Sequence, residues 1–450
     1  MRKRLKVCSR GRVRRCIPSE RLFTGRNNCC LNIMYKIAII QFPGTNCEYE
    51  AVRAVKQAGM QPAFFRWNRP ASQLKPFDGY VISGGFSYED RIRSGAIAAR
   101  DPLLEVIKQE AEKGNPVLGL CNGAQILVES GLIPGFETYS LGVSLACNTR
   151  GYLNLWVHIK NEAQPGRCAF NHFANGRYFR LPIAHGEGRF VIPQELLNQL
   201  IANHQTVFRY CDEHGNVIDE YPVNPNGSVY SLAGVCNPEG NVLALMPHPE
   251  RVEAGQVIFQ SMKKYLEDGN KQFGASKALD DDIPQVEITT YQKPENSMEF
   301  LVDLIITDNE AETLQVALEQ LKFGRIKVRR FIHWEVGLDI SQDLDRNALT
   351  QELIDSGELL NTNKEIPYVD DKGVLLPKSH TILVRYKDDF VGEEKLHTLR
   401  HRLGTTGITS VKRGVVWQIT CRDKTWAKIL ESHILFNPYS QSVSFYSDRN

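Results

Sequence analysis

Residues 115–125 read NPVLGLCNGAQ, an apolar stretch that passes through Gly-x-Cys-x-Gly into the pattern AQILVES. The apolar stretch is typical of a buried strand, and the pattern after it is typical of a helix. A cysteine flanked by glycines between a strand and a helix predicts a nucleophile elbow, a strained turn from which the Cys121 side chain projects above the sheet. The positive end of the helix favours the thiolate of Cys121. Inert packing, the usual role of a buried cysteine, fits these glycines less well.

On both sides of this turn, short apolar runs alternate with helical patterns between residues 34 and 266. The strands we expect include residues 36–40, 79–83 and 116–120, and the helices include residues 50–58 and 103–112. Strands that alternate with helices indicate an α/β domain in which a parallel sheet is covered by helices on both faces. We therefore assign residues 34–266 to one domain.

The composition of the 450 residues, 42% hydrophobic and 24% charged, is typical of a soluble protein. No apolar run approaches the ~18 residues of a membrane helix, so we expect no membrane association. Residues 1–33 hold ten Lys or Arg and one Glu, a net of +9, which leaves 44 basic and 51 acidic residues elsewhere, a net of −7. The eleven cysteines show no repeating spacing, which indicates a reducing, cytoplasmic location rather than a disulfide framework.

The basic stretch 1–33 lacks an apolar core, so a secretory signal is improbable. An Arg-rich transit peptide, a basic arm for nucleic acid, and a translated upstream stretch that is not part of the fold all stay open. We favour the last, because the first expected strand begins directly after Met34. Without these residues the chain is mildly acidic, and we expect no nucleic-acid partner.

The C-terminal part contains an internal repeat. Residues 267–297 lack periodicity and are interpreted as a linker. Aligning Gly324 with Gly407 superposes two alternating apolar segments, with Trp334 on Trp417. Each copy, 298–372 and 373–450, is expected to run strand, helix, long strand, helix, final strand. These residues predict a duplicated small α+β domain, an internal pseudo-dimer with a scaffolding role.

A base and an acid for the thiol are found in LMPHPER, residues 245–251. His248 and Glu250 are two positions apart in a segment held extended by prolines, so both side chains can lie on the same side. Taken alone, the tripeptide His-Pro-Glu could equally well occur by chance. Together with the elbow, the chain order Cys121, His248, Glu250 predicts a catalytic triad.

Attack of the thiolate on a carbonyl needs N–H donors for the oxyanion. The elbow geometry offers the backbone N–H of Asn122. The glycine pair in Ser83-Gly84-Gly85-Phe86, directly after an expected strand, offers a second donor at Gly85, because glycine lets the backbone approach a ligand. The pair Cys211-x-x-His214 has no second pair near it, so we assign no metal site.

These residues resemble the class I glutamine amidotransferases, and within them the glutaminase subunits of phosphoribosylformylglycinamidine synthase, the fourth step of purine biosynthesis. The motifs that carry the resemblance are IIQFPGTNCEYE (39–50), SGGFSYEDRIRSGAIAA (83–99), GLCNGAQIL (119–127), LPIAHGEGRF (181–190) and LMPHPER (245–251). The tandem units look like two copies of the small bridging subunit of the same synthase. That likeness rests on the repeat and on the strings LLN and LFN.

The resemblance implies a flavodoxin-like amidotransferase domain that hydrolyses the side-chain amide of glutamine. Cys121 would be the nucleophile, His248 the general base and acid, and Glu250 the carboxylate that orients the histidine. Gln125 would help to hold glutamine, and the backbone of Gly85 and Asn122 would form the oxyanion hole. The family usually has Pro at Ser83 and Gly at Glu89, and a side chain at position 89 puts the loop geometry in question if that position requires a positive φ.

The resemblance also implies a partner. Ammonia would pass to a large ATP-binding synthetase subunit, which converts formylglycinamide ribonucleotide to formylglycinamidine ribonucleotide. This chain has no Gly-x-x-x-x-Gly-Lys-[Ser/Thr] loop, so we expect no cofactor here and place ATP and Mg²⁺ on the partner. Two other functions stay open: a partner-independent cysteine hydrolase of peptides or γ-glutamyl conjugates, and a non-catalytic scaffold of the same fold.

Overall fold

The computed structural model describes residues 34–270, 279, 288–371 and 373–446. The expectation for residues 1–33 therefore lies outside the described residues. Two large sheets, one of nine and one of seven strands, organise the described chain, and a two-stranded sheet accompanies the first of them. In the described residues, no helix is long and apolar enough to cross a membrane.

The nine-stranded sheet has the order β2-β1-β3-β4-β11-β10-β9-β6-β7. Its strands are β1 (Lys36–Gln41), β2 (Gln61–Arg66), β3 (Gly79–Ile82), β4 (Val117–Leu120), β6 (Leu153–Asn161), β7 (Tyr178–His185), β9 (Phe208–Cys211), β10 (Leu232–Cys236) and β11 (Val242–Leu245). The helices that accompany it are α1 (Glu48–Gln57), α2 (Pro102–Glu112), α3 (Asn122–Glu129), α4 (Gln194–Ala202) and α5 (Gln256–Glu267). The five expected elements are present, with small shifts at their ends.

The expectation of a parallel sheet is correct for only five of these nine strands. The pairs that join β2, β1, β3, β4 and β11 are parallel, whereas β10, β9, β6 and β7 pair antiparallel. The reason is visible between β10 and β11, where the connection runs only from Asn237 to Asn241. A parallel pair needs a crossover of a dozen or more residues, so a connection this short forces an antiparallel turn.

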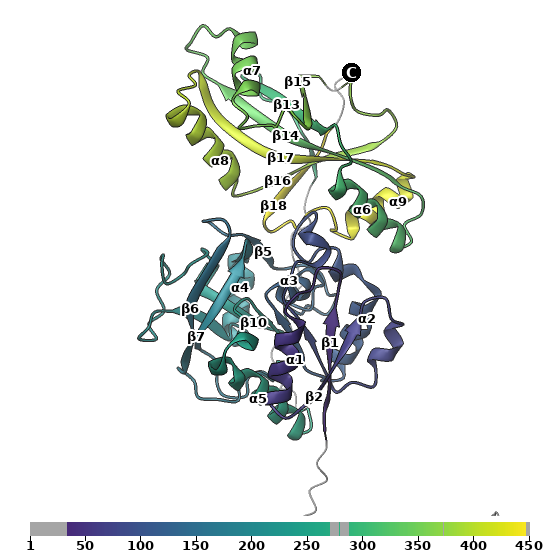
Figure 1. Cartoon of the computed structure of the whole chain (residues 1–450), viewed down its shortest axis with the longest axis vertical. Coiled ribbons are helices and arrows are strands. Elements are labelled where there is room, and N and C mark those ends of the chain that lie inside the picture. Colours follow the sequence, from purple (N-terminus) through teal and green to yellow (C-terminus); the bar gives the residue numbers. More distant parts are fainter. Residues whose placement is uncertain (1–33, 271–278, 280–287, 372, 447–450) are drawn as a thin grey trace, which may run out of the picture. The chain divides into compact units, whose positions relative to one another are not determined.

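Alternate residues of the central strands point to opposite faces, and each face has its own core. One face carries Ile37 and Ile39 of β1 and packs against α1 and α5. The other carries Ala38 and Ile40 and packs against α2, α3 and α4. Figure 1 shows α1 and α5 on one side of the β1 region and α2 on the other. A strand buried on both faces reads as a continuous apolar run, which explains KIAII.

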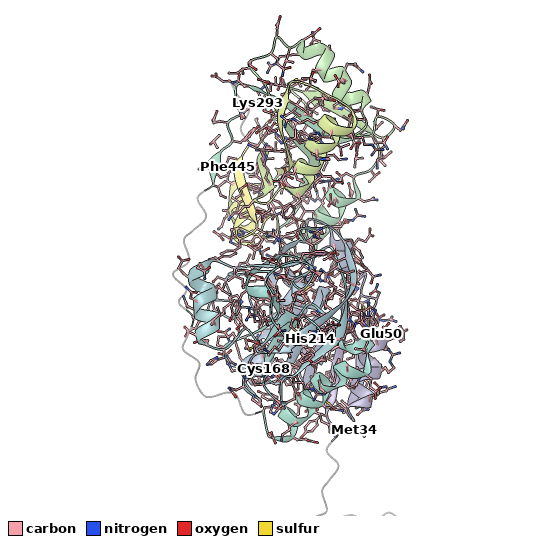
Figure 2. All side chains as sticks on the ribbon, turned by 90° about the vertical axis from the view of Figure 1, so that its left-hand side faces the viewer. Met34, Glu50, Cys168, His214, Lys293 and Phe445 are labelled. Carbon is pink, nitrogen blue, oxygen red and sulfur yellow. The ribbon has the colours of Figure 1, made fainter. Side chains whose placement is uncertain are left out.

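The seven-stranded sheet has the order β12-β18-β16-β17-β14-β13-β15. Its strands are β12 (Thr289–Thr290), β13 (Ser297–Leu304), β14 (Lys327–Leu338), β15 (Glu365–Val369), β16 (His380–Tyr386), β17 (Ile408–Thr420) and β18 (Gln441–Phe445). Its helices are α6 (Asn309–Gln320), α7 (Arg346–Asp355), α8 (Phe390–His397), followed by a π-helical turn (Thr398–Arg402), and α9 (Asp423–Glu431). In Figure 2, Phe445 of β18 and Lys293, which precedes β13, both lie in this part of the chain.

Residues 267–297 are not entirely a linker. Thr289 and Thr290 form β12, which pairs in parallel with β18, and the preceding helix α5 extends to Glu267. Two-residue strands are below the length at which side-chain alternation gives a signal, so the pattern of this segment could not reveal β12.

All four α-helices of the second sheet pack on one face. Helices α6 and α9 share one apolar cluster with Trp417, and α7 and the end of α8 share another with Trp334. The opposite face carries a buried polar cluster, in which the ring Nε2 of His333 lies 2.6 Å from Oε1 of Glu299 and Arg385 donates to Glu335 at 2.9 Å. The two longest strands, β14 and β17, pair antiparallel along the middle of the sheet.

Candidate active site

The elbow expected at Cys121 is present. Cys121 lies between β4 and α3 with φ 50° and ψ −106°, a conformation that costs energy for a residue with a Cβ. The flanking glycines are required by space, because a Cβ on Gly119 would lie 2.5 Å from the carbonyl oxygen of Gly123. A Cβ on Gly123 would lie 1.9 Å from the carbonyl oxygen of Ile82 in β3. The close approach of α3 to the strands thus fixes the Gly-x-Cys-x-Gly spacing.

His248 and Glu250 lie together, as their spacing predicts. Ring Nδ1 of His248 is 2.6 Å from Oε1 of Glu250, and both side chains are almost completely buried. The backbone N–H of His248 donates to the carbonyl of Pro182 at 2.9 Å, which anchors the segment on β7. Burial alone would lower the pKa of His248, but the Glu250 carboxylate and the Cys121 thiol outweigh it and hold this pKa well above its usual value.

The glycine pair after β3 lies against the same histidine. A Cβ on Gly84 would lie 2.9 Å from Cε1 of His248 and 3.5 Å from Cβ of Cys121. Gly85 has φ 152°, and its backbone forms an isolated bridge with Thr45. Asn122 is the first residue of α3, so its N–H has no acceptor within the helix. The two backbone segments named as oxyanion donors therefore come from the loop after β3 and from the start of α3, both of them next to Cys121.

Gln125 connects the elbow to a neighbouring loop. Its carboxamide nitrogen donates to the carbonyl of Glu187, and its oxygen accepts from the side chain of Asn122 at 2.9 Å. Asn122 in turn accepts from the N–H of Ser87 at 3.1 Å and donates to Asp90 at 3.1 Å. These bonds tie the elbow, the glycine loop and the 187 region into one network.

The loop that contains Glu89 has positive φ angles, at which glycine is usually found. Glu89 has φ 57°, and Tyr88 and Asp90 beside it have φ 53°. Side chains rarely adopt this region, so the loop is strained at three successive positions. The Glu89 carboxylate is exposed and pairs with Arg91 at 2.5 Å. A glutamate therefore stands at a position of positive φ, where the resemblance led us to expect glycine.

Two further groups, Cys47 and Arg251, lie at the site and were not predicted from the sequence. Nη2 of Arg251 donates to Sγ of Cys47 at 3.0 Å, and Cys47 contributes to the raised pKa of His248. Both residues lie inside quoted motifs, PGTNCE and HPER, but only the fold brings the start of α1 beside the histidine. The presence of a second thiol in the first of these motifs was the one local signal for it.

Two acidic groups near Gln125 are also perturbed. Burial raises the pKa of Asp90 to about 6 and that of Glu187 to about 7. Glu187 accepts from the N–H of Ser94 at 3.1 Å, which lowers its pKa less than burial raises it. These carboxyl groups therefore gain or lose a proton close to neutral pH.

The side chains of Cys211 and His214 lie in different surroundings. Cys211 is buried in β9, whereas the side chain of His214 is 75% exposed and lies near Glu213. Figure 2 labels His214 among the residues of the first sheet. Among the described residues, a group of three side chains suited to a metal ion occurs instead at Cys47, His248 and Glu250.

Comparison with known proteins shows the family to which this domain is related. A family model described as a CobB/CobQ-like glutamine amidotransferase domain matches residues 34–275. The chain belongs to this family of glutamine amidotransferases. The match contains the elbow, the glycine pair and the His-Pro-Glu segment, and it ends before the second sheet begins.

The individual relatives within this family are subunits of one enzyme. Phosphoribosylformylglycinamidine synthase subunit PurQ of Methanothrix thermoacetophila is 45% identical over 260 residues, 52% of this chain and 98% of that protein. The same subunit of Pyrococcus furiosus is 42% identical over 241 residues, 52% of this chain and 99% of that protein. A chain in the solved structure of PurLQS from Thermotoga maritima is 34% identical, with a TM-score of 0.43, over 52% of this chain and 100% of that chain.

Proposed function

We propose that Cys121, His248 and Glu250 carry out the glutaminase reaction of phosphoribosylformylglycinamidine synthase in purine biosynthesis. The chain is a glutamine amidotransferase, and its N-terminal half is similar to subunit PurQ over nearly the whole length of that subunit. The observation that supports the residue roles best is the buried His248–Glu250 pair at 2.6 Å, beside a cysteine on a strained elbow.

The first step is attack of the Cys121 thiolate on the side-chain carboxamide of glutamine. The raised pKa of His248 favours the imidazolium, and the attack requires the Cys121 sulfur in its thiolate form. The imidazolium then protonates the departing ammonia, and a γ-glutamyl thioester forms. The neutral imidazole next takes a proton from water, which cleaves the thioester to glutamate. Glu250 holds the ring orientation and stabilises its positive charge throughout.

The thiolate attacks the carboxamide carbon, and the oxyanion that develops on the carbonyl oxygen needs fixed donors. We assign this role to the backbone N–H groups of Gly85 and Asn122. Both belong to rigid elements, the bridge to Thr45 and the first turn of α3. Gln125 supports the binding of glutamine from the same turn, since it sets the distance between α3 and the carbonyl of Glu187.

We further propose that the ammonia is used by a synthetase partner. That partner would bind ATP and Mg²⁺ and convert formylglycinamide ribonucleotide to formylglycinamidine ribonucleotide. The proposal extends the likeness to a named synthase subunit, and it places the complex in the cytoplasm, where purines are made. It assigns no cofactor to this chain.

The second sheet is proposed to be a tandem pair of small domains that bridges to the partner. Its support is the pairing of β14 with β17, where Val328 lies opposite Ile419 and Val336 lies opposite Val411. In the repeat alignment, Val328 corresponds to Val411 and Val336 to Ile419, so each cross-strand pair is the counterpart of the other. Such self-complementary pairing is the hallmark of a two-fold interface.

The order of strands has the same symmetry. From the centre outward, β14, β13 and β15 occupy one half of the sheet, and β17, β16 and β18 occupy the other. The helices follow the strands in the same sequence in both halves, with α6 and α7 in one and α8 and α9 in the other. This arrangement supports the boundary near residue 372 and a duplication of one ancestral unit.

The test is glutamate release from glutamine by the full chain, with and without the synthetase partner. We expect release that the partner stimulates and that Cys121→Ala lowers by about 10⁴-fold or more, because the nucleophile is lost. Cys421→Ser, which removes a thiol from the second sheet region, is the matched control and should retain the activity. Glutamine turnover that survives Cys121→Ala would refute the assignment, and turnover of γ-glutamyl peptides in place of glutamine would point to the competing hydrolase function.

A further inference from the structure

The strings LLN and LFN of the repeat lie in two turns of the same construction. The first-copy turn (residues 356–365) follows α7 and ends at the first residue of β15, and the second-copy turn (residues 432–441) follows α9 and ends at the first residue of β18. Each turn leaves its helix through a residue of positive φ, 70° at Gly357 and 51° at His433. This left-handed conformation commonly ends a helix, so the two helices end in the same way.

An asparagine holds each turn together through the same two hydrogen bonds. The backbone N–H of Asn361 donates to the carboxylate of Glu365 at 2.6 Å. At the equivalent position, the N–H of Asn437 donates to the carboxamide oxygen of Gln441 at 2.8 Å. The side-chain oxygen of each asparagine accepts from the backbone N–H two residues later, at 3.1 Å in both turns. The side-chain nitrogen of each asparagine is therefore left to point away from its own turn.

The second-copy turn is bound to the amidotransferase domain. Asn437 is 0% exposed, and its side-chain nitrogen donates to Oε1 of Glu129 at 3.0 Å and to the carbonyl of Val143 at 3.2 Å. The guanidinium of Arg93 holds the Glu129 carboxylate and also donates to two carbonyls of the turn, at 2.6 and 3.0 Å. Arg100 donates to a third carbonyl at 2.8 Å. The turn thus binds an arginine–carboxylate pair.

The first-copy turn presents the same groups at the surface. Asn361 is exposed, and in the part of the chain that the structure describes no hydrogen bond reaches its side-chain nitrogen. The carbonyls of Gly357 and Glu358 correspond to the two that Arg93 binds in the second copy. The first copy has therefore kept the shape and the polar groups of a docking surface.

The bound turn indicates what kind of molecule fits the exposed one. A second copy of this chain cannot bind there as the second-copy turn does, because Asn437 of the same chain already covers Glu129. The exposed turn also carries Glu358, paired with Lys395 at 2.7 Å, where the bound turn has Ile434. The additional carboxylate suits a surface that is richer in arginine. The occupant is therefore a different protein that presents an arginine beside a carboxylate.

We propose that the first-copy turn is the docking surface for the synthetase partner, where Asn361 donates to a carboxylate that an arginine of that protein holds. The second-copy turn binds the amidotransferase domain and the first-copy turn binds the synthetase, so the two equivalent surfaces of the pseudo-symmetric pair each serve one component. This inference rests on the proposed function, because it assigns a surface to the bridging role.

The experiment measures binding of the full chain to the purified large synthetase subunit by isothermal titration calorimetry. Asn361→Asp keeps the oxygen that accepts within the turn, but it replaces the donating nitrogen and brings two carboxylates together. We expect its Kd to rise at least about tenfold. Asn347→Asp makes the same change of charge at the exposed start of α7 and should bind as the wild type does. Equal Kd values for Asn361→Asp and the wild type would overturn the proposal.

A second variant covers the case in which Asn361→Asp does not fold. Glu358→Arg reverses a charge on the same turn and gives up only a partly exposed ion pair with Lys395, which contributes little to stability. Its Kd for the synthetase should also rise by about tenfold, because two guanidinium groups then face each other. Unchanged binding of the folded Glu358→Arg variant contradicts the proposed arginine on the partner.

Two further measurements separate this proposal from its alternatives. Both variants should release glutamate at the wild-type rate when the synthetase is absent, since neither residue touches the triad, and loss of binding is therefore independent of the Cys121→Ala result. Light scattering of the chain alone tests for a second copy at the turn. A dimer that Asn361→Asp abolishes would overturn the assignment to the synthetase. A wild-type chain that does not bind the synthetase would refute the docking surface and leave the glutaminase assignment intact.

Discussion

The two large sheets of this chain differ in how their side chains are used. Around Cys121, backbone strain and glycines without room for a Cβ gather at the turn that carries the nucleophile. Around Trp334 and Trp417, the side chains fill two similar apolar clusters on one face of a sheet whose long strands β14 and β17 pair antiparallel. The first region accepts backbone strain to hold reactive groups, whereas the helix-covered face of the second is filled mainly by apolar packing.

Among the variants considered, the largest expected effect is that of replacing Glu250, whose carboxylate lies against the His248 ring. In Glu250→Gln the amide oxygen can still accept from Nδ1, but the negative charge is gone. We expect the rate of glutamate release to fall by about 10²- to 10⁴-fold, because the imidazolium loses its stabilising partner. A smaller loss than that, at unchanged KM, would show that Glu250 is not part of the triad.

The same variant has a pH signature. In the wild type the folded pKa of His248 is raised, so this group adds stability that is complete below its unfolded pKa of about 6.5 and is lost as the pH rises through the folded value. In Glu250→Gln the carboxylate no longer opposes burial, so we expect the pKa of His248 to be lower than in the wild type and the stability to be lost at a lower pH. NMR titration of the histidine ring protons measures both states, and an unchanged His248 titration would contradict the assigned cause.

The second sheet should respond to mutation as a symmetric pair. Trp334→Ala and Trp417→Ala each remove a nearly buried indole from an apolar cluster, and each should lower the free energy of unfolding by about 3–5 kcal/mol. Urea titration followed by circular dichroism provides the measurement. Glutamate release below the unfolding transition should change by no more than about twofold, since neither side chain lies near the triad. A large cost at one tryptophan alone would argue against equivalent copies.

Substitution of two glycines tests whether the backbone is packed more closely at the elbow than in the second sheet region. Gly123→Ala places a Cβ 1.9 Å from the carbonyl oxygen of Ile82, and we expect a loss of about 2–3 kcal/mol together with the activity. Gly324→Ala is the matched control in the second sheet region, where φ is 98° and no atom lies within 4 Å of the added Cβ. Its cost should be only about 1 kcal/mol, from the backbone conformation alone. Equal melting temperatures for the two variants would show that the close approach at the elbow is not required.

The smallest expected effect is at Glu89. Glu89→Gly removes the strain of a positive φ and should raise the free energy of unfolding by about 0.5–1 kcal/mol. Glu89→Ala keeps the Cβ and loses the exposed pair with Arg91, which is worth little. The alanine variant should therefore match the wild type, and thermal melts that reverse this order would exclude backbone strain as the cause.

Much of the first region could be predicted from sequence because its signals are local. The elbow, the His-Pro-Glu segment and the glycine pair each lie within a few consecutive residues, and the conformation of Glu89 follows from the same kind of argument. Pairing between distant strands has no local signal. The antiparallel half of the first sheet, the two-residue strand β12 and the position of Cys47 beside His248 all depend on which segments meet in the folded chain.

The pairing of β14 with β17 also has a consequence for how the second sheet can evolve. In a homodimer one gene encodes both subunits, so every substitution appears twice. Here, under the proposed duplication, His333 faces Glu299 in the first copy, while Val416 occupies the position of His333 in the second. Arg385 of the second copy completes the cluster through Glu335 of the first. If the two halves arose by that duplication, their covalent linkage would let each half change alone, so that one half could acquire a charged centre that two identical subunits would both have to carry.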